Sequence, residues 1–183
     1  MQGHIQYVRD LLYEIPQEAQ DDLEGEIDRL FLKQSMESFI REYADAGGWR
    51  NDPTLYIKIP LFATDHVLSQ RESTPEGIRS DLLTLLAQIP AFLNVASRNL
   101  HRPSEISRQV ALNMAGDAFD LHNRDIRAYI EEKIGGNEEL LTKNHKVLEA
   151  WEQYQKELLQ LPSRKSFAIG ENDLEKILAI SRI

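Results

Sequence analysis

The sequence predicts an all-α protein, a bundle of about seven mostly antiparallel helices, several of them long and some kinked by prolines. Apolar residues recur at spacings of three and four along most of the 183-residue chain, and this period gives a helix one apolar face. Glycine (9) and proline (7) are sparse, which disfavours a fold of short strands and tight turns. The connections between apolar stretches are short, which favours antiparallel neighbours in a single helical domain, 1–183.

The first two helices are expected at residues 4–14 and 17–44. Pro16 separates them, and Gly47-Gly48 provides a strong stop signal after the second. The second helix carries an apolar stripe that the spacing predicts to be buried. Its members are Leu23, Ile27, Leu30, Phe31, Met36, Phe39, Ile40 and Tyr43.

A third helix is expected at residues 53–69. Asp52 is placed to cap it, with Pro53 as its first residue. Pro60 lies inside it and predicts a kink. A strand at residues 55–59 is the alternative, but the apolar stripe continues beyond that segment at helical spacing and favours a helix.

Two long helices follow, at residues 74–101 and 103–134. Thr74 is the expected N-cap of the first, which Pro90 interrupts. Gly135-Gly136 is expected to end the second.

The last two helices are expected at residues 138–160, beginning at Asn137, and from about residue 172 to the C-terminus. Pro162 stops the first of them, and a short extended or loop segment at 167–170 precedes the second.

The composition limits the classes of partner and site. The formal net charge of −9 and the pI near 5.1 disfavour a nucleic-acid partner, since a phosphate backbone would be repelled. The absence of cysteine excludes disulfides, thiolate zinc sites and cysteine nucleophiles. No apolar run approaches the roughly 20 residues of a membrane span, and no signal peptide begins the chain. A bacterial cytoplasmic location and export with the leader removed both stay open.

The five histidines fit no known metal or catalytic spacing. They are His4, His66, His101, His122 and His145. No pair forms the H-E-x-x-H of a zinc peptidase, and none follows a glutamate by three residues as in di-iron bundles. Nucleotide-binding glycine loops and nucleophile elbows are also absent. We therefore predict no catalytic, cofactor-binding or metal-ligating residue in this chain, which by itself is not expected to be an enzyme.

One polar constellation stands out on the longest predicted helix. Asp120 and Arg124 are spaced to meet on one face, and His122 and Asp125 lie three residues apart. Two interpretations stay open: a polar strip lining a cleft, or an exposed helix face with weak ion pairs. The strip comprises Asp117, Asp120, His122, Arg124 and Asp125, with Arg127 beyond them.

Three further side chains invite a functional interpretation. Asp65 and His66 are adjacent, but adjacent helical residues point about 100° apart, so they form no acid–base dyad. We expect His66 to be a semi-buried packing residue. Trp49 and Trp151 could stack on a ligand, yet both are better interpreted as core residues.

Several segments occur in a recognisable order: 51–56 (NDPTLY), 86–93 (LAQIPAFL) with Asn99-Leu100 and Pro103 after it, and 167–170 (FAIG). In order and rough spacing they are similar to the N-terminal half of a bacterial family known as domain of unknown function 885. The likeness covers most of the chain.

The resemblance implies a lobe that walls a substrate cleft and supports a second, zinc-bearing lobe. Members of that family look like helical zinc metallopeptidases, with their H-E-x-x-H in the C-terminal half. This sequence stops before that point, so it has no counterpart of the zinc ligands or the general base. Zinc is implied only for full-length relatives. The chain is thus expected to be a truncated or naturally short, non-catalytic lobe.

Two functions follow as expectations. A lobe would pair with its missing C-terminal half, or with a copy of itself as a homodimer, and would expose an apolar docking surface. A free-standing helical protein-interaction module is the alternative, and it would show a well-covered surface with one discrete groove.

Overall fold

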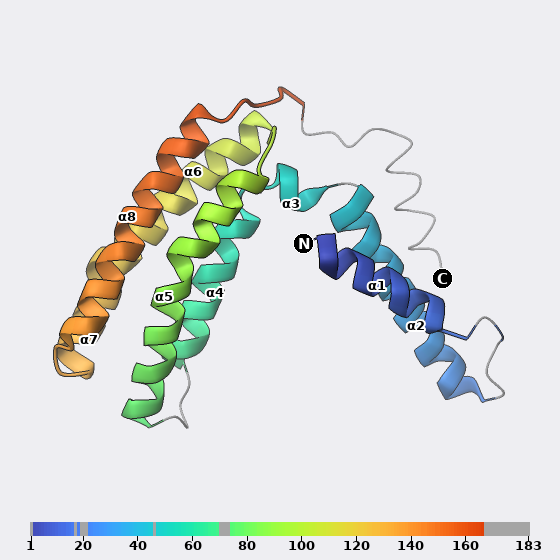
Figure 1. Ribbon diagram of the computed structural model, residues 1–183, viewed down its shortest axis with the longest axis horizontal. Helices are drawn as coiled ribbons and strands as arrows, with labels where there is room; N and C mark the ends of the chain where they lie inside the picture. The colour runs from blue at the N-terminus through green and yellow to red at the C-terminus, as the bar shows by residue number, and fades with distance from the viewer. Residues whose placement is uncertain (1, 17, 19–21, 46, 70–73, 167–183) are drawn as a thin grey trace. The chain divides into compact units, whose positions relative to one another are not determined.

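A computed structural model describes residues 2–16, 18, 22–45, 47–69 and 74–166. Over these ranges the chain is all-helical and forms no strand, apart from one isolated bridge between Ser104 and Arg164 (Figure 1). The all-α prediction is therefore confirmed. The helix predicted from about residue 172 lies outside the described residues. Within the described part, no helix is long and apolar enough to cross a membrane.

The chain divides into two compact units. The described residues of unit 1 fall within 2–49, and those of unit 2 within 50–166. The sequence predicted a single domain over residues 1–183, without this division. Each unit is described below by itself.

Unit 1 contains helix α1 (Gln2–Glu14), helix α2 (Leu23–Ile40) and the π-helical continuation η1 (Arg41–Asp45). The carboxylate of Asp22 accepts a hydrogen bond from the Gly25 N–H at 2.7 Å and so caps α2. α1 packs against α2 and η1. Both predicted helices are present, the second beginning later than expected because its cap is Asp22.

The prediction that α2 buries its apolar stripe is wrong. No residue of α2 is buried, and Leu23, Ile27, Leu30 and Phe31 are exposed. Among the described residues, the elements that pack against α2 are α1 and its own continuation η1. α1 packs on the other side of α2, where Gly25, Arg29 and Met36 help to line the groove between the two helices.

The junction between the units is a short helix, α3 (Gly48–Asn51), after Gly47 at φ 61°. Trp49 is buried, as predicted. Asp52 then accepts hydrogen bonds from the Thr54 N–H (2.9 Å) and hydroxyl (2.7 Å). Its carboxylate therefore caps a turn that leads into the third predicted helix, which begins at Leu55.

The remaining helices follow the predicted order. They are α4 (Leu55–Ser69), α5 (Pro75–Asn99), α6 (Glu105–Asp120) with its π-helical continuation η2 (Leu121–Ile126), α7 (Arg127–Lys133) and α8 (Glu138–Gln160). Thr74, Ser104 and Asn137 cap α5, α6 and α8 through their side-chain oxygens. Gly135 and Gly136 follow α7 with positive φ. Helix is thus confirmed over strand at 55–59.

The proline kinks are not confirmed, because α4 runs unbroken through Pro60 and α5 through Pro90. If each π-helical segment is counted with the α-helices it continues, and the short α3 is left aside, the described residues form six long helices. The seventh predicted helix lies outside these residues, so the count of about seven is not confirmed.

Four helical rods make up unit 2. α4 packs against α5 and α6, and α8 packs against the same two helices. The colour gradient in Figure 1 shows that α5 and α8 run in the same direction, as do α4 and α6. Helices consecutive in the chain are antiparallel as predicted. Of the four packed pairs, however, α4–α6 and α5–α8 are parallel. Short connections therefore fix the direction of successive helices without fixing which helices pack together.

The core of unit 2 lies among these rods. Its largest fully buried side chains include Trp151 and Tyr154, whose rings meet edge to face at 6.2 Å. Trp151 is therefore a core residue, as predicted. The Tyr154 hydroxyl donates to the Pro53 carbonyl at 3.0 Å, and burial raises the pKa of this phenol.

Main-chain contacts tie the end of α8 to the start of α6. The Glu105 N–H donates to the Arg164 carbonyl and the Arg164 N–H to the Pro103 carbonyl, both at 2.9 Å. The Arg108 guanidinium donates to the Leu161 carbonyl at 2.9 Å. The segment after α8 is thus held along this end of the bundle.

Candidate functional site

The predicted polar strip lies on the rod formed by α6, η2 and α7. Asp117, Asp120, Arg124 and Asp125 are all exposed. Arg124 pairs with its neighbour Asp125 through bonds of 2.8 and 3.2 Å, rather than with Asp120 one turn earlier. The hydrogen bond from Arg124 lowers the pKa of Asp125 below its ordinary value.

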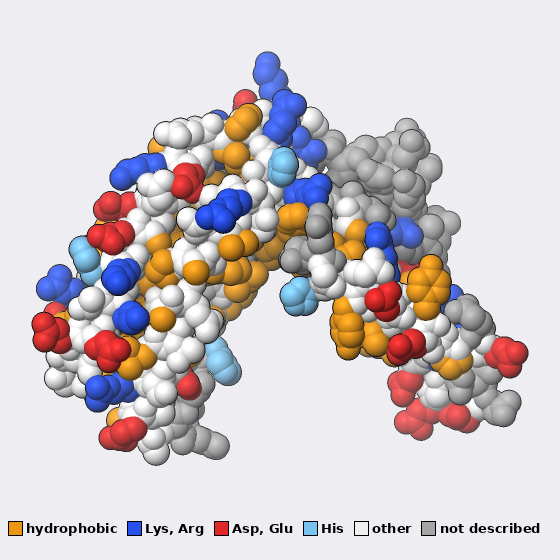
Figure 2. Space-filling model, in the orientation of Figure 1, with side chains coloured by type: hydrophobic (Ala, Val, Ile, Leu, Met, Phe, Trp, Pro, Cys, Tyr) orange, Lys and Arg blue, Asp and Glu red, His pale blue; other side chains and the backbone are white. Residues whose placement is uncertain are grey.

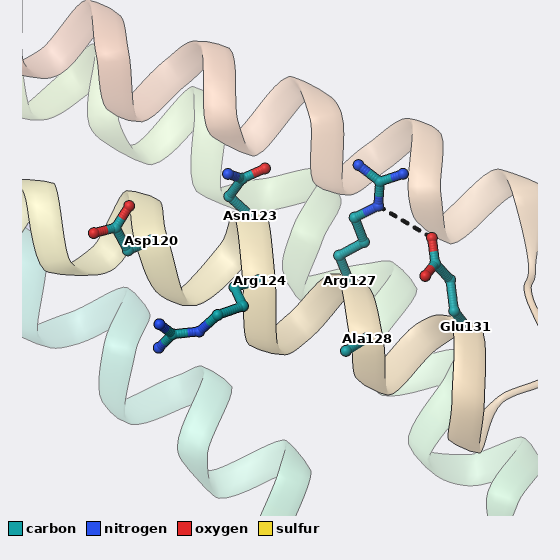
Figure 3. A pocket seen from close by; sticks show the side chains of 6 residues that line it. All are labelled: Asp120, Asn123, Arg124, Arg127, Ala128 and Glu131. Atoms are coloured by element: carbon teal, nitrogen blue, oxygen red, sulfur yellow. Dashed lines mark hydrogen bonds and ion pairs between the residues drawn. The ribbon is translucent and has the colours of Figure 1, made fainter.

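A shallow polar depression lies beside this pair. Figure 3 shows that its lining side chains come from successive turns of one rod. Arg127 and Glu131 form an ion pair within it at 3.1 Å. No residue from another described element lines the depression. This arrangement favours the exposed-face interpretation over the cleft, because a cleft needs walls from more than one element. The six lining residues are Asp120, Asn123, Arg124, Arg127, Ala128 and Glu131.

His122 does not join the strip. Its side chain is fully buried (0% exposed) and lies 2.9 Å, Nδ1 to Oδ1, from Asn144 of α8. The Asn144 amide nitrogen donates to the His122 main-chain carbonyl at 2.8 Å. The predicted approach of His122 to Asp125 is therefore not observed, since the two residues point to opposite environments.

The two bonds fix the position of one proton of His122. Asn144 uses its amide nitrogen on the carbonyl, so its oxygen faces the ring and must accept. Nδ1 therefore carries a proton, in the neutral imidazole as in the imidazolium. Nε2 is buried and has no hydrogen-bond partner among the described residues. Burial lowers the pKa of His122, and the bond to Asn144 offsets this in part.

Asn144 was not singled out from the sequence, although a signal was present. It lies four residues after Leu140 and three before Val147, on the buried stripe of α8. His122 lies four residues after Ala118 and four before Ile126, on the buried stripe of its own rod. A polar residue on an apolar stripe requires a partner, and two such residues on different helices could have been paired on that ground.

No cluster of three or more histidine, aspartate or glutamate side chains suited to a metal ion occurs in the described part of the chain. Apart from His122, the histidines are all exposed, namely His4, His66, His101 and His145. The expected semi-burial of His66 is wrong, because Thr64 and Val67 occupy the buried face of α4 and turn His66 outward.

A second candidate site is the apolar surface of unit 1. Along α2, Leu23 is 78% exposed, Phe31 69% and Ile27 56%. On the other side of α2 lies a groove against α1, with Leu11, Ile15, Leu32 and Met36 among its lining residues. In Figure 2 several hydrophobic side chains are visible at the surface of these helices, with charged side chains between them. Exposed apolar surface of this extent along one helix is typical of an interaction site.

Comparison of the chain with protein-family models, with curated proteins and with solved structures finds no match.

Proposed function

We propose that this chain is a non-catalytic helical lobe, which walls the substrate cleft of a zinc-metallopeptidase-like protein and supports the catalytic half. The uncovered apolar face of α2 carries this proposal, as the surface on which the other half docks. We name this face the α2 face and define it by Leu23, Ile27, Leu30 and Phe31, all exposed.

The physical support is the cost of leaving such a face in water. Burying one large aliphatic or aromatic side chain stabilises a complex by about 1.5–3 kcal/mol. Four such side chains follow one another at helical spacing, so a single partner surface can cover them together. The resemblance to domain of unknown function 885 proteins supplies the identity of the partner, a zinc-bearing half.

The alternative is a free-standing helical interaction module. The groove between α1 and α2 favours it, since apolar residues line the groove and Asp28 and Arg29 flank them. Such a groove suits an amphipathic helix from another protein.

The reading frame downstream of codon 183 distinguishes the two. An H-E-x-x-H encoded there supports the lobe, whereas a frame that closes without one supports the interaction module. Zinc analysis of the purified chain adds an independent check. The lobe should hold no stoichiometric zinc, and tightly bound zinc in equal amount would contradict the assignment of the chain as non-catalytic.

A pair of matched variants tests the docking face itself. Phe31 on α2 and Phe62 on α4 are almost equally exposed, at 69% and 70%. Sedimentation velocity over rising concentration should show self-association of the chain, weakened by Phe31→Ser and unchanged by Phe62→Ser. A chain that stays monomeric at high concentration, or one that responds to Phe62→Ser instead, would contradict a docking role for the α2 face.

A further inference from the structure

We propose that His122 and Asn144 form a pH-sensitive latch, which holds the π-helical turn η2 against α8 when His122 is neutral and releases it when His122 is protonated. This inference is independent of the proposed function. It rests on the burial of the ring, the two reciprocal bonds and the orphaned Nε2.

The latch joins two helices through both a side chain and the main chain. Asn144 contacts the His122 ring at 2.9 Å and the His122 carbonyl at 2.8 Å. Both residues are buried. The Asn144 side chain on α8 therefore holds both the orientation of the His122 ring and the position of the main chain that carries the ring.

The π-helical turn makes that backbone position special. A π-turn bonds each N–H to a carbonyl five residues back; such turns are rare and frequently occur at functional sites. Ile126, at the end of η2, is fully buried, and α7 beyond it adds only Ile130 to the buried residues. Among the described residues, Ile126 and Ile130 are the fully buried apolar side chains of this part of the rod, and the latch adds a polar contact to them.

Protonation of His122 places an N–H at Nε2, in a surrounding that suits only an unprotonated nitrogen. The neutral ring donates from Nδ1 to Asn144 and presents an unprotonated Nε2, which tolerates an apolar surrounding. The imidazolium keeps the Nδ1 bond but gains an N–H at Nε2, which has no acceptor among the described residues. A buried charge with an unpaired donor strongly favours a state in which the ring reaches water.

No neighbouring charge offsets this. Within five residues of His122 or Asn144, the packed elements carry Asp117 and Asp120 on α6, Arg124 and Asp125 in η2, Arg127 on α7, and Glu139, Lys143, His145, Lys146 and Glu149 on α8. All of these are exposed except Lys143, which is half-buried. Burial and the bond to Asn144 are the causes of the lowered His122 pKa, and no carboxylate contributes to it.

The direction of the pH effect follows from linkage. An unfolded chain binds this proton with a pKa of about 6.5, and the folded chain binds it less readily. The latch is therefore fully effective above about pH 6.5 and is lost as the pH falls below that value.

Nitrogen-15 NMR of the intact chain tests the latch without any substitution. At neutral pH, the His122 Nε2 should show the chemical shift of an unprotonated nitrogen and Nδ1 that of a protonated one. On acidification, His122 should titrate at a pH below the ordinary histidine pKa of about 6.5. A His122 that is protonated at Nε2 at pH 7.5, or that titrates at the ordinary histidine pKa, would overturn the proposal.

Hydrogen exchange tests the release. Protection of residues 121–133, corrected for the intrinsic rate, should fall about tenfold for each unit by which the His122 pKa is lowered. His122→Asn keeps a donor near Nδ1 but cannot be protonated, so it should remove this pH dependence, while His145→Gln should keep it. Equal protection at pH 7.5 and pH 5 in the wild-type chain would overturn the proposal even if His122→Asn fails to fold.

Discussion

Helices α2 and α8 both carry apolar side chains at helical spacing, but only α8 buries them. α8 buries six residues, among them Trp151 and Tyr154, in a bundle with α5 and α6. α2 buries none. Both sequences place apolar side chains at spacings of three and four, and both form the helix that this spacing predicts. The pattern shows which face of a helix avoids water, but it does not show whether anything covers that face.

The largest expected effect contrasts one aromatic residue from each helix. Trp151→Ala should lower the free energy of unfolding of unit 2 by about 3–5 kcal/mol, because it empties a fully buried site. Phe31→Ala on α2 should change it by less than about 0.5 kcal/mol. Urea denaturation followed by circular dichroism measures both. A large loss from Phe31→Ala in the monomer would mean that the α2 face is covered after all.

A smaller effect is expected from the polar bond in the core of unit 2. Tyr154→Phe removes the donor to the Pro53 carbonyl at little change in shape. It should cost about 1 kcal/mol of unfolding free energy in urea titrations. No loss would show that this hydroxyl is equally well satisfied by water.

Helix caps offer a comparable change in each unit. Asp22→Ala removes the cap of α2 and Asn137→Ala that of α8, each worth about 1 kcal/mol. If the units unfold separately, Asp22→Ala should shift a transition reported by α1 and α2 and leave the Trp151 fluorescence transition, followed in a Trp49→Phe background, unchanged. Asn137→Ala should do the reverse. A single transition that both variants shift equally would show that the two units unfold as one.

The smallest effect is expected at the polar strip. Arg124→Ala should leave stability unresolved from wild type, since both partners of the ion pair are exposed. It should raise the pKa of Asp125 towards its ordinary value, because the hydrogen bond that lowers that pKa is gone. Carbon-13 NMR of the Asp125 carboxyl measures this shift, and an unchanged pKa would show that the pair does not persist in solution.

Local signals in the sequence predicted most of the helices. Thr74 and Asn137 correctly predicted the starts of two helices, and Gly135-Gly136 predicted the end of another. These predictions succeed because a helix cap or a positive φ depends on only a few neighbouring residues. The parallel packing of α5 with α8 was not predictable in this way. It depends on how four apolar faces fit together, which no single stretch of sequence encodes.

The candidate sites show the same difference between local signals, which the sequence contains, and contacts between distant segments, which it does not reveal. The exposure of Asp120 and Arg124 was one of two open interpretations, since spacing places residues on a face without saying what lies opposite. The bond between His122 and Asn144 joins residues 22 positions apart, so it requires knowledge of the packed pair η2 and α8.

The central claim is that no described element covers the α2 face, whereas α8 is buried in the core of unit 2. Hydrogen exchange measured by mass spectrometry, at a dilution where the chain is monomeric, tests it most directly. The amides of α8 around Trp151 should exchange slowly, through opening of the whole bundle, and those of α2 should exchange orders of magnitude faster. Protection of α2 equal to that of α8 in the monomer would contradict the account.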